Sequence, residues 1–241
     1  MMKLKLIFSY DGSAFLGSAK QPHLKGVQDG LQNALKHLGI SKPVLFASRT
    51  DKGVHANRAV ASIECEDFFK DLKNLKNQIN RFAHPFIHIK EIQRVEEDFE
   101  VRFCVKAREY NYVFFHGDFN PFLARYVHFY PPFDIKRALE ILSLFKGKHD
   151  FRYFSKSKGC AKTSTREMFY IKAYRYKKIT IFKFRANGFL RAQIRLMVAS
   201  VLAVLEGRLK EEELKEQLEL KNCYFRLLVP PNGLYLSRII Y

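Results

Sequence analysis

The 241-residue sequence contains no tryptophan, only four cysteines and no long apolar run. The cysteines are far apart and form no Cys-x-x-Cys pair, so we expect neither a disulfide framework nor a structural metal. No stretch approaches the roughly 20 apolar residues that a membrane span requires. Residues 1–8 are too short and too alternating for a signal peptide and predict a strand, which favours a cytoplasmic protein with reduced thiols.

Acidic residues are also scarce, because 24 Asp and Glu stand against 42 Lys and Arg, for a formal net charge of +18. Such an excess favours polyanionic partners, nucleic acid above all, although a generally basic proteome or a solubility device would have the same sign. The charge is clustered: residues 151–178 hold nine Lys or Arg, one acidic residue and seven Phe or Tyr. Cations that neutralise phosphates beside rings that stack on bases favour nucleic acid.

Strands and helices alternate in both halves of the chain. Alternating polar and apolar residues predict a strand at 3–10, and further strands are predicted at 44–47, 59–63, 86–95, 110–116, 168–176, 179–185 and 234–240. Helical spacing predicts helices at 27–38, 71–82, 135–145 and 189–205. This order predicts an α+β fold of mainly antiparallel sheets flanked by helices. We expect two related subdomains, 1–106 and 107–241.

A polar turn, Ser-Arg-Thr-Asp-Lys-Gly-Val-His-Ala at 48–56, directly follows the apolar run 44–47. Gly53 permits a sharp turn, and a loop at the end of a buried strand is a usual place for reactive groups. Asp51 is the only carboxylate of the turn, and Arg49 lies two residues before it. Taken alone, Asp51 suits a turn residue or a helix cap better than a catalyst, because Asp is favoured in both roles.

Two arginines lie in the predicted helix 189–205. Arg191 and Arg195 are four residues apart, so both should project from one side of that helix. Arg195 has apolar neighbours on either side, and a buried arginine there would need an anionic partner. Two solvated arginines are the alternative interpretation.

Two tyrosines, Tyr110 and Tyr112, alternate along the predicted strand 110–116 and therefore share one face. Core packing is the default interpretation. A tyrosine at the edge of a cleft can instead stack on a base while its hydroxyl handles a proton.

Five motifs, in this order, resemble those of the TruA family of tRNA pseudouridine synthases. They are Tyr-Asp-Gly-Ser-x-x-x-Gly at 10–17, Ser-Arg-Thr-Asp-Lys-Gly-Val-His at 48–55, Ala-Arg-Glu-Tyr-Asn-Tyr at 107–112, Phe189 with Arg195 and Val198, and Gly-Leu-Tyr-Leu at 233–236. The chain departs from the family's pattern at a few positions. The family's Gly-Trp-Gln is here Gly17-Ser18-Ala19, and its glycine before Arg-Thr-Asp is Ser48.

The resemblance implies an isomerase that converts uridine to pseudouridine. Asp51 would be the nucleophile that cleaves the glycosidic bond, after which the uracil rotates and rejoins the ribose through C5. Arg195 would pair with Asp51, and Tyr110 would stack on the uracil and take part in proton transfer. Arg49 would fill the space of the flipped nucleotide or contact the phosphate beside it. Leu234 would pack against the base.

The resemblance further implies a catalytic cleft between the two subdomains and a homodimer in which one tRNA contacts both subunits. The target uridines would be positions 38–40, in the anticodon stem-loop. An isomerisation needs no cofactor and no metal. A non-catalytic RNA-binding protein is the main alternative, and a metal-dependent nuclease or phosphatase would want further carboxylates such as an Asp-x-Asp, which the sequence lacks.

Overall fold

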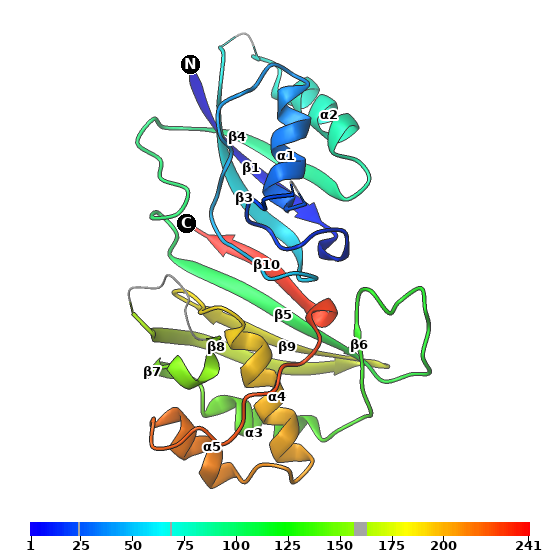
Figure 1. Ribbon diagram of the computed structural model, residues 1–241, viewed down its shortest axis with the longest axis vertical. Helices are drawn as coiled ribbons and strands as arrows, with labels where there is room; N and C mark the ends of the chain where they lie inside the picture. The colour runs from blue at the N-terminus through cyan, green and yellow to red at the C-terminus, as the bar shows by residue number, and fades with distance from the viewer. Residues whose placement is uncertain (24, 68, 157–162) are drawn as a thin grey trace. The chain divides into compact units, whose positions relative to one another are not determined.

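The computed structural model describes residues 1–23, 25–67, 69–156 and 163–241 (Figure 1). The chain forms two compact units: a first unit of Met1–Lys106 with Tyr235–Tyr241, and a second unit of Ala107–Leu234. The expected second subdomain, 107–241, is therefore wrong at its end, because the closing strand belongs to the first unit. Both units mix helices with mainly antiparallel strands, as the α+β class predicts.

The sheet of the first unit includes the last strand of the chain, which lies beside β3. In spatial order its strands are β4 (Ile87–Val95), β1 (Met2–Tyr10), β3 (His55–Cys65) and β10 (Leu234–Ile240), with the short β2 (Leu45–Phe46) also paired to β3. Strand β1 is antiparallel to both of its neighbours. Strand β10 pairs in parallel with β3, with Tyr235 opposite His55. This pairing between distant segments is why the closing strand joins the first unit.

Two helices, α1 (Val27–Lys36) and α2 (Leu72–Ala83), pack on the sheet of the first unit (Figure 1). Helix α2 begins one residue after the predicted start at Asp71, because the Asp71 side chain caps it by accepting hydrogen bonds from the backbone of Lys73 and Asn74. Its apolar side buries Leu75 and Ile79. The 3-10 turn η1 (Gly12–Ala14) follows β1 and leads toward α1.

The second unit contains the predicted hairpin. Its strand order is β5 (Ala107–Phe115), β9 (Ile179–Ala186), β8 (Thr165–Tyr176) and β7 (Gly147–Asp150), with β6 (His128–Phe129) beside β5. Strands β8 and β9 turn across Lys177 and Lys178, as expected. Of the basic segment 151–178, Lys158 and Lys162 lie outside the described residues, as does Cys160.

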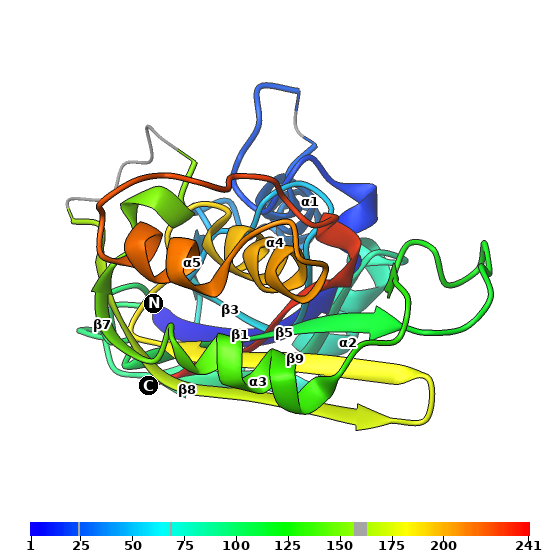
Figure 2. The same cartoon turned by 90° about the horizontal axis from the view of Figure 1, so that it is seen from below.

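Helices α4 (Gln193–Leu205) and α5 (Glu211–Leu218) lie on the same side of strands β8 and β9 (Figure 2). Ten of the thirteen residues of α4 are buried, as expected for a helix that is apolar on nearly all sides. Helix α3 (Ile135–Ser143) and the 3-10 turns η2 (Arg152–Phe154) and η3 (Pro231–Gly233) complete the unit. None of the helices in the described part of the chain is long and apolar enough to cross a membrane.

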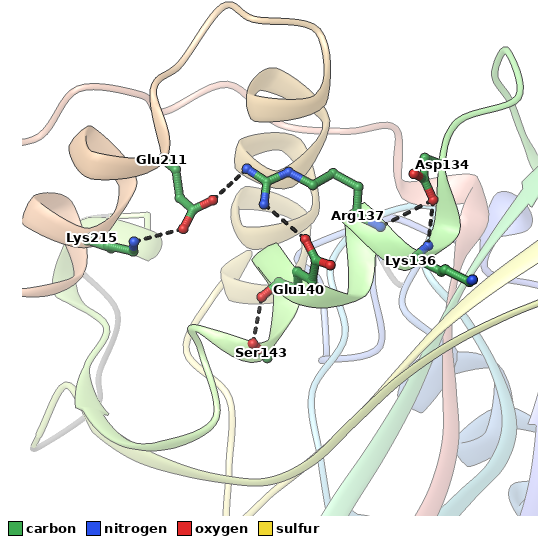
Figure 3. A network of polar contacts seen from close by, with 7 residues as sticks. All are labelled: Asp134, Lys136, Arg137, Glu140, Ser143, Glu211 and Lys215. Carbon is green, nitrogen blue, oxygen red and sulfur yellow. Dashed lines mark hydrogen bonds and ion pairs between the residues drawn. The ribbon is translucent and has the colours of Figure 1, made fainter.

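A polar network on the surface joins α3 to α5 (Figure 3). The Arg137 guanidinium contacts Glu140 on its own helix at 3.0 Å and Glu211 of α5 at 2.6 Å, and Lys215 contacts the same Glu211 at 2.8 Å. Asp134 caps α3 by accepting from the backbone of the helix's first turn. Each pair has at least one well exposed partner, so each contributes little to stability.

The predicted helix 189–205 begins later than expected. Ala192 has a left-handed backbone with φ of +62°, and α4 starts after it at Gln193. The Gln193 side chain accepts a hydrogen bond from the Leu190 amide at 2.8 Å, which closes a turn before the helix. Arg191 is therefore exposed and off the helix, and the expectation that it shares a helical side with Arg195 is wrong. Hydrophobic spacing does not reveal a reversal of the backbone at one residue.

Candidate functional site

Asp51 lies in the turn between β2 and β3, half-buried, and Arg49 before it is exposed. Gly53 has a φ of +79°, and the Val54 amide donates to the Asp51 carbonyl at 3.2 Å. Asp51 is thus a turn residue by its backbone and does not cap a helix. The turn that carries the carboxylate connects two paired strands of the sheet, β2 and β3.

The far end of this turn is held by residues that follow β1. The Gly12 amide donates to Nδ1 of the buried His55 at 3.1 Å, and this nitrogen also lies 3.2 Å from Asp11 Oδ1. A Cβ atom on Gly12 would lie 2.0 Å from the Val54 carbonyl oxygen, so only glycine fits there. The His55 ring stacks on Tyr235 with centroids 4.8 Å apart, which ties β10 to the turn. The Tyr-Asp-Gly motif therefore supports the Asp51 motif.

The three remaining predicted site residues, Tyr110, Arg195 and Leu234, belong to the second unit. Tyr110 is 6% exposed on β5, and its ring packs edge-on against Phe189 at 5.1 Å. Arg195 is on α4, as predicted, and its Nε donates to the Val229 carbonyl at 2.8 Å. Leu234 is buried at the start of β10. The pairing of Asp51 with Arg195 remains a prediction.

Two side chains fix the segment that leads to Leu234. The Tyr112 hydroxyl donates to the Pro230 carbonyl at 2.8 Å, next to the bond between Arg195 and Val229. Sequence patterns predict Tyr112 only as the strand neighbour of Tyr110 and contain no sign of this contact. Burial raises the pKa of Tyr112 far above its usual value, and the nearby Arg195 charge offsets part of that rise. The hydroxyl therefore stays protonated and donates to the Pro230 carbonyl.

Because of His128, we expect the free energy of unfolding to depend on pH. It lies beside Tyr112, with Nδ1 3.1 Å from the tyrosine hydroxyl, and burial lowers its pKa from 6.5 to about 4. The unfolded chain takes up this proton below about pH 6.5, whereas the folded chain does so only near pH 4. The stability that neutral His128 contributes is complete above pH 6.5 and is lost as the pH falls toward 4.

Between pH 7.5 and pH 5 we expect this residue to lower the free energy of unfolding by about 1–2 kcal/mol. Urea unfolding at the two pH values measures the effect, and His128→Gln should flatten it. A His128→Gln protein with the same pH slope as the wild type would contradict the assignment.

Cations lie over aromatic rings on the β8–β9 hairpin. The Lys172 and Arg185 charges lie over the Tyr170 ring at 5.3 and 5.5 Å. Lys177 lies 5.4 Å over the ring of Tyr176, which is 69% exposed. Such a surface offers both phosphate neutralisation and base stacking. In the described part of the chain, no three His, Cys, Asp or Glu side chains could hold a metal ion together.

The α+β units, the carboxylate on a supported turn and the cation–aromatic hairpin fit the class of pseudouridine synthases. The profile of a family described as tRNA pseudouridine synthase matches residues 141–241. A protein named tRNA pseudouridine synthase A from Campylobacter jejuni is 64% identical over 241 residues, which covers 100% of both chains. One of the same name from Wolinella succinogenes is 39% identical over 99% of this chain and 94% of its own. The chain belongs to the TruA family of tRNA pseudouridine synthases and is an isomerase of that type.

A solved structure of a Cbf5–Nop10–Gar1 complex aligns with 97% of this chain and 48% of that chain, at 12% identity and a TM-score of 0.44. So weak a similarity supports no statement about this protein.

Proposed function

We propose that this protein isomerises uridine to pseudouridine in the anticodon stem-loop of tRNA, at positions 38–40, with Asp51 as the nucleophile. The observation that carries the proposal is the Asp51 carboxylate itself. It is half-buried on a turn whose backbone is bonded to a neighbouring segment, inside the motif that resembles the family's own. Relatives named tRNA pseudouridine synthase A that match the whole chain support the substrate class.

The proposed reaction begins when an Asp51 carboxylate oxygen attacks the ribose C1′ of the target uridine. The bond between C1′ and N1 breaks, and its electron pair leaves with the uracil. The uracil then rotates and its C5 attacks C1′, which expels the carboxylate of Asp51 unchanged. The hydrogen on C5 is lost to solvent and N1 takes up a proton, so atoms and charge balance without a cofactor.

We assign four further roles by the resemblance. The Arg195 guanidinium supplies positive charge to the Asp51 carboxylate, and Arg49 replaces the flipped nucleotide or contacts a phosphate beside it. Tyr110 stacks on the uracil and its hydroxyl takes part in the proton transfer at C5. Leu234 packs against the plane of the base. The edge-on contact with Phe189 supports the role of Tyr110, because it fixes the plane of the ring.

Flipping the target nucleotide out of its stem costs a few kcal/mol. We propose that the basic surface, with the β8–β9 hairpin as a part, offsets this cost through contacts with phosphates of the tRNA. We also propose a cytoplasmic homodimer, with one tRNA contacting both subunits. Sedimentation equilibrium of the 28.3 kDa chain tests the dimer, which would have twice that mass.

The function is tested by tritium release from tRNA labelled at uridine C5. The protein alone, without added metal or cofactor, should release tritium from the labelled positions 38–40. A non-catalytic RNA-binding protein would instead bind tRNA with a steep salt dependence and release none. Binding without tritium release from any tRNA would therefore contradict the proposal.

A further inference from the structure

Thr50, the residue before Asp51, has each of its three hydrogen-bonding groups paired with the segment 10–18. Its amide donates to Ser18 Oγ at 2.7 Å, and its carbonyl accepts from the Ser18 amide at 3.1 Å. Its hydroxyl shares a 2.7 Å hydrogen bond with the hydroxyl of Tyr10. Ser18 alone therefore bonds both backbone groups of Thr50. These two bonds fix the backbone of the residue that precedes Asp51.

Ser18 is itself anchored by helix α1. It is 1% exposed, and its carbonyl accepts from the Gln28 amide at 3.0 Å, while the Gly17 carbonyl accepts from the Val27 amide at 3.1 Å. These acceptors satisfy two amides of the first turn of α1, which have no partner within the helix. Gly17 has a φ of +111°, and a Cβ atom there would lie 3.1 Å from the Thr50 carbonyl oxygen. The Gly17–Ser18 pair thus links the start of a helix to Thr50.

The bond from the Thr50 amide to the Ser18 hydroxyl depends on the side chain at position 18. The family motif has tryptophan where this chain has Ser18, and an indole ring donates a hydrogen bond but cannot accept one. Only an acceptor at position 18 can pair with the half-buried amide of Thr50. Without it that amide would be left unsatisfied, at a free-energy cost comparable to a lost hydrogen bond.

We propose that Ser18 is a positioning residue for the reaction at Asp51: its hydroxyl holds the Thr50 amide so that the carboxylate is presented at a fixed place. The inference rests on the proposed function of Asp51. Attack on C1′ requires reacting atoms about 3–3.5 Å apart, and a misplacement of about 1 Å can cost on the order of 100-fold in rate. The role of Ser18 is therefore in the turnover step and not in the binding of tRNA.

The test compares Ser18→Ala with Ser18→Thr and with Ser13→Ala, an exposed serine of the same segment. We expect Ser18→Ala to lower kcat for tritium release about 10- to 100-fold, with the Kd for tRNA within about twofold of the wild type. Amide hydrogen exchange at Thr50 should become faster in the same variant. Ser18→Thr keeps an acceptor and should recover most of kcat, and Ser13→Ala should match the wild type.

An unchanged kcat in Ser18→Ala would overturn the inference. An equal loss of kcat and of tRNA affinity, or a Ser18→Thr protein as slow as Ser18→Ala, would overturn it too, because a purely structural role gives those results. If Ser18→Ala does not fold, Ser18→Cys carries the same expectation, since its thiol is only a weak acceptor. Asp51→Asn, run in parallel, separates the two ideas: an active Asp51→Asn removes the proposed function itself, whereas an inactive one beside a fully active Ser18→Ala removes only this inference.

Discussion

Asp51→Asn should lose tritium release by about 10⁴-fold or more, while its affinity for tRNA stays within a few fold of the wild type. An amide cannot attack C1′ as a carboxylate does, whereas its size and shape are nearly the same. The bonds that hold this turn at Thr50 and Val54 do not involve the Asp51 carboxylate, so they can persist in the variant. The loss should therefore appear in kcat, measured by single-turnover tritium release at saturating tRNA.

Asp67→Asn is the matched control. Asp67 is an exposed carboxylate of the same unit whose partner is the N-terminal amine at 3.2 Å. Its loss should leave turnover unchanged. Full activity in Asp51→Asn would reject the nucleophile assignment, and a large loss of tRNA affinity would show that the carboxylate serves binding instead.

Arg195→Ala should lower activity about 10²- to 10³-fold and the free energy of unfolding by about 1–2 kcal/mol. The stability term follows from the structure of the second unit. The Arg195 Nε holds the Val229 carbonyl beside the bond from Tyr112 to Pro230, and truncation leaves that acceptor without this donor. The expected loss of activity follows from the proposed pairing with Asp51, because the Asp51 carboxylate would lose its counter-charge.

Arg195→Lys separates the effect on activity from the effect on the free energy of unfolding. Lysine keeps the positive charge but cannot reproduce the directed Nε–H bond, so it should recover part of the activity and little of the stability. Arg191→Ala is the control, since Arg191 is exposed and lies before the helix. Urea unfolding and tritium release measure both properties. Unchanged unfolding and turnover in Arg195→Ala would show that the assignment of Arg195 is wrong.

Local patterns in the sequence predict most of the elements. The strand β1, the β8–β9 hairpin and helix α2 all follow from local patterns over a few residues. The errors arise where distant contacts decide the structure. Strand β10 joins the first unit through parallel pairing with β3. The helix at Arg195 starts late because Ala192 takes a left-handed backbone, which the apolar pattern does not reveal.

Part of the candidate site can be predicted from the sequence, and part of it depends on distant contacts. The motif around Asp51 can be recognised from the sequence because its residues are consecutive. Its support by Ser18 and Tyr10 cannot, since those residues lie 32 and 40 positions away from Thr50. The contact of Tyr112 with Pro230 spans 118 positions. The sequence hints at the Ser18 contact in one way only: a serine stands where the family motif has tryptophan.

The most direct test maps pseudouridine in tRNA from a strain that lacks this protein. The strain carries an empty vector, the wild-type gene or the Asp51→Asn gene. Pseudouridine should be absent at positions 38–40 with the empty vector, return with the wild type and stay absent with Asp51→Asn. Pseudouridine at those positions without the protein, or its return with Asp51→Asn, would contradict the account.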